Sequence, residues 1–185
     1  MFRKLFNHEL GRLSAEEFKE AKKSPLVVVL DNIRSQHNIG SAFRTADSFR
    51  VEKIYLCGIC ATPPTAEIHK SALGAEFSVD WEYYKETIDV VKRLKDEGFT
   101  IISVEQAENS TMLDSFQLPE NQKIALIYGN EVKGVEQAVV DASDICLEIP
   151  QYGTKHSLNV SVTIGIVLYT LSARELIAMD SSSQR

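Results

Sequence analysis

Apolar residues gather in short runs that alternate with segments of helical period. The run LVVVL at 26–30 is continuous and β-branched, as is typical of a strand covered on both faces. Four further apolar runs predict strands at 53–57, 99–105, 123–129 and 145–150.

Segments with helical patterns separate the strands. Ser14 followed by Glu17 forms a capping-box pattern, which predicts a helix that ends before Pro25. Residues 61–80 and 108–122 look irregular. The remaining segments predict helices at 39–49, 85–98, 134–143 and 157–179. This alternation predicts an α/β fold with a mainly parallel sheet flanked by helices.

Length and composition fit one globular domain, with 185 residues that are 44% hydrophobic and 25% charged. We predict a short N-terminal helical extension at 1–24, a single domain at 25–179 and a frayed tail at 180–185. Charge interrupts the N-terminal apolar residues, and polar residues interrupt the longest apolar run, near 158–171. We therefore expect no signal peptide, no membrane partner and a cytoplasmic location.

The net charge of −6 is unevenly distributed. Residues 1–60 carry +3 and residues 61–185 carry −9. The mildly basic end could face a polyanion, although a solvated surface explains it equally simply.

The chain has three cysteines, which cannot all pair, so the sequence does not predict a disulfide framework. Two of them stand in the segment CGIC, at the spacing of a redox dithiol. Cys57 ends an apolar strand, whereas a redox dithiol should open a helix. No second cysteine pair completes a zinc site. We expect Cys57 and Cys60 to be buried thiols and no metal to be bound, with a redox protein as the competing interpretation.

Polar residues follow the strand at 26–30, and ligands of open parallel sheets bind beyond the carboxyl ends of strands. There, Asn38 and Arg44 stand in the segment NIGSAFRTAD. Arg44 also has a purely structural interpretation, as a surface residue of a helix that pairs with Asp47 at i+3.

Polar residues also follow two further predicted strands. After ALIY, Gly129 permits a tight turn, and Glu131 is either functional or an ordinary helix-capping carboxylate. The signatures of phosphate and dinucleotide loops are absent from the sequence. After LEIP, Ser157 could be a helix N-cap, while the amide of Asn159 needs partners if it is buried.

Three segments then resemble the sequence motifs of the SpoU/TrmH family of RNA ribose methyltransferases, in the SPOUT superfamily. They are NIGSAFRTAD, ALIYGNEVKGVEQAVVDASD and LEIPQYGTKHSLNVSVTIGIVLY, and they occur in the family's order. The resemblance spans roughly residues 25 to 172. It implies transfer of a methyl group from S-adenosylmethionine to a ribose 2′-hydroxyl of tRNA or rRNA. It also implies a C-terminal trefoil knot and a homodimer.

The resemblance assigns roles to five polar residues. Arg44 is the implied catalytic arginine, supported by Asn38. Glu131 is the acid of the second motif, and Ser157 and Asn159 are the polar pair of the third.

The resemblance also implies where the cofactor lies and which nucleic acid is the substrate. S-adenosylmethionine would lie near the backbone of Ser103, Val104, Gly129, Ile149 and Leu158. A required 2′-hydroxyl makes RNA the partner and excludes DNA.

Two roles for Arg44 stay open. It either acts as the base with help from a substrate phosphate, or stays cationic and clamps the phosphate and the developing oxyanion. The alternatives to this enzyme are a non-catalytic RNA-binding or assembly protein and a methyltransferase with another acceptor. We expect RNA contacts from basic residues, namely Arg3, Lys4, Arg12, Lys19, Lys22, Lys23, Arg34, Arg50 and Lys155.

Overall fold

The computed structural model describes residues 1–118 and 122–183, and it describes side chains except for Asn7 and residues 173–183. Its centre is a seven-stranded sheet in the order β3-β2-β1-β6-β4-β7-β5, in which every neighbouring pair is parallel. The strands are β1 (Ser24–Asp31), β2 (Val51–Cys57), β3 (Asp80–Tyr84), β4 (Thr100–Val104), β5 (Thr111–Met112), β6 (Ile124–Tyr128) and β7 (Ile145–Glu148). The predicted parallel α/β fold is therefore confirmed.

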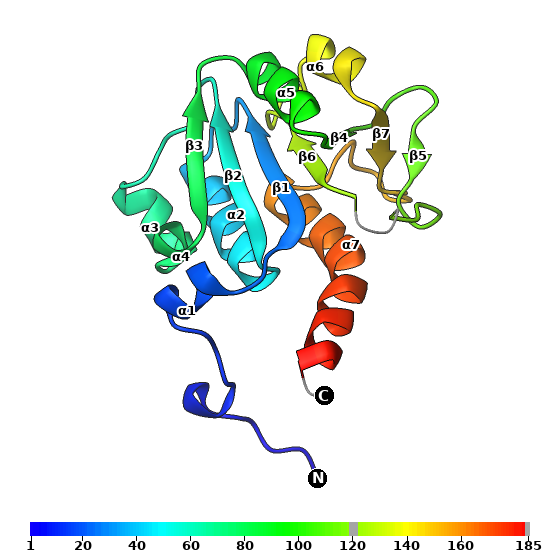
Figure 1. The fold of residues 1–185 in the computed structure, drawn as a ribbon. Helices are drawn as coiled ribbons and strands as arrows, with labels where there is room; N and C mark the ends of the chain where they lie inside the picture. The colour runs from blue at the N-terminus through cyan, green and yellow to red at the C-terminus, as the bar shows by residue number, and fades with distance from the viewer. Residues whose placement is uncertain (119–121, 184–185) are drawn as a thin grey trace.

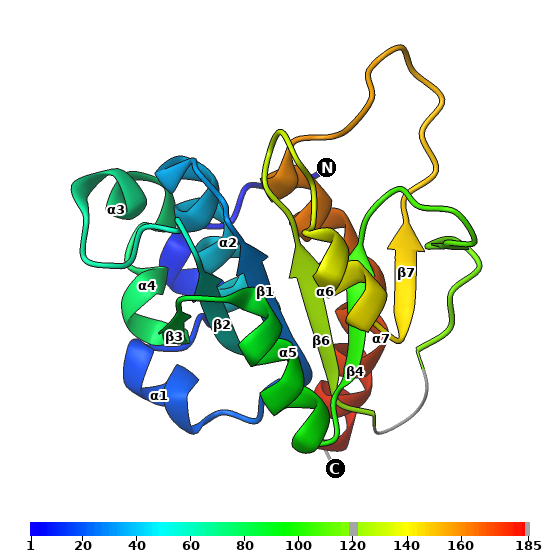
Figure 2. The same ribbon diagram turned by 90° about the horizontal axis from the view of Figure 1, so that it is seen from above.

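Helices cover both faces of this sheet (Figures 1 and 2). Leu26, Val28 and Leu30 of β1 point into one core, and Val27 and Val29 point into the other. This alternation explains the continuous apolar run, because both faces of β1 are buried. The first core packs against α1 (Ala15–Glu20), α2 (Gln36–Ser48), α3 (Ala66–Ala72), α4 (Ala75–Ser78) and α7 (Val160–Ser183), and the second against α5 (Thr87–Asp96) and α6 (Gln137–Ala142).

Sequence patterns missed two short helices and an edge strand. Residues 61–80, expected to be irregular, contain α3 and α4, and the unpredicted strand β3 follows them. The capping box of α1 forms as predicted, since Glu17 N donates to Ser14 Oγ at 3.1 Å and Ser14 N donates to Glu17 Oε2 at 2.8 Å.

The last helix, α7, begins three residues later than predicted and runs to Ser183. The frayed tail predicted at 180–185 falls partly outside the described residues, which end at 183. No helix in the described part of the chain is both long enough and apolar enough to span a bilayer.

Candidate functional site

A hydrogen-bond network joins the three polar junctions that the sequence singles out. The Glu131 carboxylate accepts from the backbone N–H groups of Arg34 and Ser35 and from Asn38 Nδ2, each at 3.0 Å. Asn159 Nδ2 donates onward to Asn38 Oδ1 at 3.3 Å. Segments more than 90 residues apart in sequence therefore meet at one point beyond the carboxyl ends of β1 and β6.

The Glu131 carboxylate is held in its ionised form. Burial alone raises the pKa of this group, but the hydrogen bonds from Arg34, Asn38 and Ser35 outweigh that effect and lower the pKa below its ordinary value. Because the first two N–H groups lie at the start of α2, Glu131 also stabilises the positive end of that helix. Such a carboxylate is suited to hold Asn38 and is a poor proton acceptor at neutral pH.

Glu131 is fixed by a tight turn over residues 129–134. Asn130 and Gly134 exchange two backbone hydrogen bonds, at 2.9 and 3.0 Å. A Cβ on Gly129 would lie 2.0 Å from Val135 N, and Gly134 has a φ of +70°. The missing side chain of Gly129 therefore admits the chain's own backbone at 134–135, and Gly129 also lines the cavity described below.

The third junction reverses the roles expected for Ser157 and Asn159. Asn159 caps α7, because its Oδ1 accepts from Ser161 N at 2.9 Å and from Ser161 Oγ at 2.6 Å. Ser157 is exposed, and its hydroxyl has no hydrogen-bond partner among the described residues. The hydroxyl of Ser157 is therefore available to a ligand, and the side-chain amide of Asn159 also caps α7.

Arg44 lies on the exposed side of α2, outside the network. Its guanidinium makes no hydrogen bond or ion pair with any residue described. The pairing with Asp47 that would explain Arg44 as a surface residue does not form, since Asp47 Oδ2 instead accepts from Ser78 Oγ at 2.6 Å. Arg44 is thus an exposed cation with its donors free for an anionic partner.

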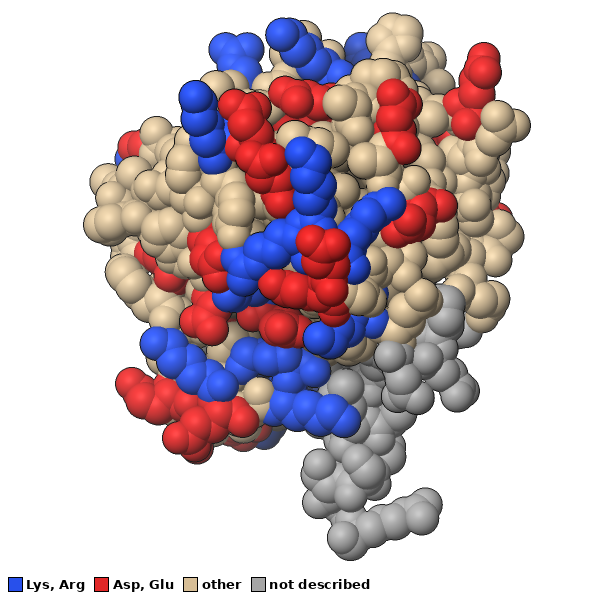
Figure 3. Space-filling view, turned by 45° about the horizontal axis from the view of Figure 1, so that its top comes forward, with Lys and Arg blue, Asp and Glu red and all other residues tan. Residues whose placement is uncertain are grey.

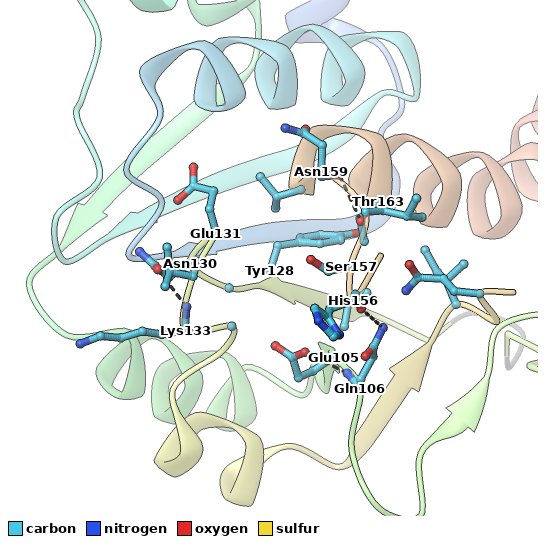
Figure 4. Close-up of a pocket in the computed structure, with 18 of the residues that line it drawn as sticks. Glu105, Gln106, Tyr128, Asn130, Glu131, Lys133, His156, Ser157, Asn159 and Thr163 are labelled. Carbon is cyan, nitrogen blue, oxygen red and sulfur yellow. Dashed lines mark hydrogen bonds between the residues drawn. The ribbon is translucent and has the colours of Figure 1, made fainter. Parts of the chain in front are cut away.

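A cavity of about 520 Å³ opens beside the network, a size that fits a small ligand (Figure 4). Val104, Gly129, Ile149 and Leu158 line it, as do Glu131, Ser157 and Asn159. Neither Asn38 nor Arg44 lines it. Ser103 also lies outside it, because its buried hydroxyl is 2.7 Å from Ser143 Oγ.

The apolar part of this lining fits an adenosine group. Four aliphatic side chains, Val104, Leu147, Ile149 and Leu158, offer flat contact area for a purine, and backbone groups of the turn offer hydrogen bonds to its edge.

Two residues of the cavity, Glu105 and Gln106, were missed by sequence reasoning. They directly follow β4, so the rule that directed attention to the other strand ends also points to them. Gln106 Nε2 donates to the carbonyl oxygen of His156 at 2.8 Å and ties the loop before α7 to the cavity wall.

The two cysteines of CGIC are buried, unpaired thiols. Burial raises the pKa of Cys57 to about 12 and that of Cys60 to about 11. Cys60 Sγ donates to Leu30 O at 3.3 Å. Burial thus disfavours the thiolate form at both positions, which argues against a reactive redox dithiol. Across the described residues, no cluster of His, Cys, Asp and Glu is arranged to hold a metal ion.

The fold and site define a class of protein: a parallel α/β domain whose strand-to-helix junctions gather polar residues beside a cavity at the sheet's carboxyl edge. Comparison with known proteins is more specific. The chain belongs to the SpoU rRNA Methylase family, whose model matches residues 25–169.

Two similar proteins are named as RNA methyltransferases. The chain is 31% identical over 156 residues to a tRNA (guanosine(18)-2′-O)-methyltransferase of Aquifex aeolicus, covering 83% of this chain and 71% of the relative. It is 32% identical over 155 residues to the 23S rRNA (guanosine-2′-O-)-methyltransferase RlmB of Nitrosomonas europaea, covering 83% of this chain. It spans only 58% of that relative's length.

Solved structures share the fold. The A. aeolicus TrmH/SpoU tRNA modifying enzyme matches with a TM-score of 0.78 and 28% identity, over 90% of this chain and 85% of that chain. An AdoMet-bound rRNA methyltransferase from Sinorhizobium meliloti matches with a TM-score of 0.76 and 24% identity, over 86% and 60% of the two chains.

Proposed function

We propose that this protein transfers a methyl group from S-adenosylmethionine to a ribose 2′-hydroxyl of tRNA or rRNA. The observation that carries the proposal is the network of Asn38, Glu131 and Asn159, which joins all three family motifs beside the cavity. The names of the relatives support the reaction class, and the apolar part of the cavity lining supports a cofactor site there.

The cofactor site proposed here uses Val104, Gly129, Ile149 and Leu158, with the backbone after Ser103 close by. S-adenosylmethionine supplies an electrophilic methyl group. The protein's task is to hold sulfur, methyl carbon and ribose oxygen in line, and such alignment can supply ~7–11 kcal/mol. Glu131 contributes indirectly, by fixing Asn38 and through it Asn159.

Arg44 is the proposed catalytic residue, supported by its unpaired guanidinium. A guanidinium binds phosphate through two parallel hydrogen bonds and stabilises a developing oxyanion. It serves as a base only where a neighbouring phosphate assists proton removal. Ser157, whose hydroxyl is free at the cavity, is positioned to contact the ribose or the cofactor.

RNA contacts are proposed around the mouth of the cavity, from Arg34 and Lys155. The face shown in Figure 3 does not favour a polyanion, since acidic and basic side chains intermingle on it. The basic N-terminal segment and α1 lie near the amino ends of the strands in Figure 1, whereas the residues that line the cavity follow the carboxyl ends of β4, β6 and β7. That segment reaches the same RNA only along an extended molecule or from a second copy of the chain.

Charge neutralisation tests this RNA surface. Arg34→Gln with Lys155→Gln should weaken RNA binding and flatten its dependence on salt, because fewer counterions are released. The matched control neutralises Lys19 on α1 and Lys22, which follows that helix. If RNA binding loses its salt dependence in the control alone, the RNA contacts lie on the N-terminal segment and not at Arg34 and Lys155.

Assembly and location belong to the same proposal. We propose a single domain over 25–179, a homodimer and a cytoplasmic protein, and the trefoil knot stays a prediction. Val162 and Tyr169 of α7 support the dimer, because they are 50% and 65% exposed on the last helix. Light scattering on the purified chain would report one mass or twice that mass.

Labelled methyl transfer tests the proposed activity. Wild type should label an unmodified tRNA or rRNA transcript, Arg44→Ala should lose turnover yet still bind cofactor, and the surface control Lys92→Ala should keep both. Cofactor binding without transfer to any RNA would instead favour the non-catalytic alternative. Full turnover in Arg44→Ala would refute both roles considered for that residue.

A further inference from the structure

The carboxylate of Glu105 is built into the cavity wall with half of its accepting capacity unused. Glu105 Oε2 accepts from Val135 N at 2.9 Å, and Glu105 Oε1 accepts from Gln106 N at 2.9 Å. No Lys or Arg pairs with it among the described residues. An ionised carboxylate has about four lone-pair sites, so each oxygen keeps one for another donor.

The surrounding backbone is shaped to admit this carboxylate. A Cβ on Gly134 would lie 2.2 Å from Glu105 Oε2, so the absence of a side chain at this position lets the carboxylate approach the turn as it does. The hydrogen bonds from Val135 N and Gln106 N fix the orientation of the carboxylate before any ligand arrives. A preorganised acceptor loses little freedom on binding.

Glu105 lies at the right place for one part of a nucleoside. Figure 4 shows Glu105 and Gln106 across the cavity from Glu131 and Asn159. If methyl transfer takes place near Asn159, the adenosine end of the cofactor extends towards the opposite wall. Val104, one residue before Glu105, belongs to the aliphatic surface suited to the purine.

We propose that Glu105 binds the two ribose hydroxyls of the cofactor's adenosine, each donating to one carboxylate oxygen. A cis-diol presents two adjacent donors, which match the two remaining acceptor sites of the carboxylate. Acidic side chains at strand ends accept from nucleoside ribose in the same way in dinucleotide-binding folds. This inference rests on the proposed cofactor site and adds a residue that selects ribonucleosides.

Binding of paired nucleosides tests the proposal by calorimetry. The probes are 5′-methylthioadenosine and its 2′-deoxy and 3′-deoxy counterparts, with S-adenosylmethionine as the reference. A hydrogen bond to a charged acceptor predicts that wild type binds each deoxy compound about tenfold or more weakly. Glu105→Ala should remove most of this preference, and Glu105→Gln, which keeps the shape of the side chain, should reduce it.

The ratio of affinities separates recognition from a merely structural role. If Glu105 only supports the turn at Gly134, its variants bind all three nucleosides more weakly by the same factor. The ratio of the affinities for 5′-methylthioadenosine and its deoxy counterparts then stays that of wild type, which would overturn the proposal. A wild type that does not discriminate would also overturn it. Glu108→Gln, a nearby exposed glutamate, is the matched control and should leave the ratio unchanged.

Failure of the proposed function has a different signature. If neither S-adenosylmethionine nor any nucleoside binds to wild type, the cofactor site itself is wrong and the role of Glu105 falls with it. If S-adenosylmethionine binds and only the ratio fails to change, the cofactor site stands and Glu105 alone is misassigned.

Discussion

Replacing Glu131 with Gln tests whether one carboxylate holds the three motifs together. Gln keeps the size of the side chain but replaces one accepting oxygen with a donating NH₂ group. The variant therefore loses at least one of the three hydrogen bonds from Arg34 N, Ser35 N and Asn38 Nδ2. It also loses the negative charge at the start of α2.

The magnitude follows from these contacts. A hydrogen bond to a charged group contributes about 1.5–3 kcal/mol when it is buried. Glu131 is exposed, so water competes for the same groups, and a loss in unfolding free energy of about 1–2 kcal/mol is expected. For a chain of this size, that loss lowers Tm by about 2–8 °C.

The pH dependence gives an independent check. The folded pKa of Glu131 lies below its unfolded value, so its contribution to stability is fully present above the unfolded pKa. It is lost as pH falls through the folded pKa. The difference in unfolding free energy between wild type and Glu131→Gln should be complete at pH 7 and should shrink below about pH 4.5.

Thermal and urea unfolding of wild type and Glu131→Gln measure this difference, with Glu52→Gln as the control. The Glu52 carboxylate is exposed and makes no hydrogen bond within the described residues. Equal stability of Glu131→Gln and Glu52→Gln at pH 7, or a difference that does not change with pH, would refute the reasoning.

Three further predictions concern the frame around the site. Gly40→Ala should lower the free energy of unfolding by about 1–3 kcal/mol, because its Cβ would lie 2.2 Å from a side-chain oxygen of α3. Gly153 has open space around it, so Gly153→Ala should leave the free energy of unfolding unchanged in the same assay. Gln106→Ala should increase hydrogen exchange in the loop at 153–158 and weaken cofactor binding, whereas unchanged exchange would show that this hydrogen bond does not hold the loop. Cys57 and Cys60 should resist iodoacetamide at pH 8 in the folded protein, as mass spectrometry would report, and fast modification would contradict their raised pKa values.

The fold was predictable where burial leaves a simple pattern. The run at 26–30 is apolar throughout because both faces of β1 are covered, and its β-branched valines favour a strand over a buried helix. The strand β3 was missed because it lies at the sheet edge. There Glu82 replaces an apolar residue and pairs with Lys53 at 2.6 Å and with Arg93 at 2.7 Å.

The candidate site was predictable in part of its membership and not in its geometry: sequence reasoning missed Glu105 and Gln106. Strand ends identify Asn38, Glu131 and Asn159, because parallel strands bring their carboxyl ends to one edge. Which residue caps α7 depends on where that helix begins, and sequence patterns locate helix ends poorly. The free lone pairs of Glu105 depend on a turn that is distant in sequence, so no local signal reveals them.

The chemical position of the transferred methyl group tests the central claim most directly. RNA labelled by the wild-type protein is hydrolysed in alkali, and the labelled product is identified by mass spectrometry. A methyl group on the 2′-oxygen blocks cleavage at that nucleotide, so the account predicts a labelled, alkali-resistant dinucleotide that is absent with Arg44→Ala. Label recovered on a base, in a mononucleotide that alkali releases normally, would contradict it.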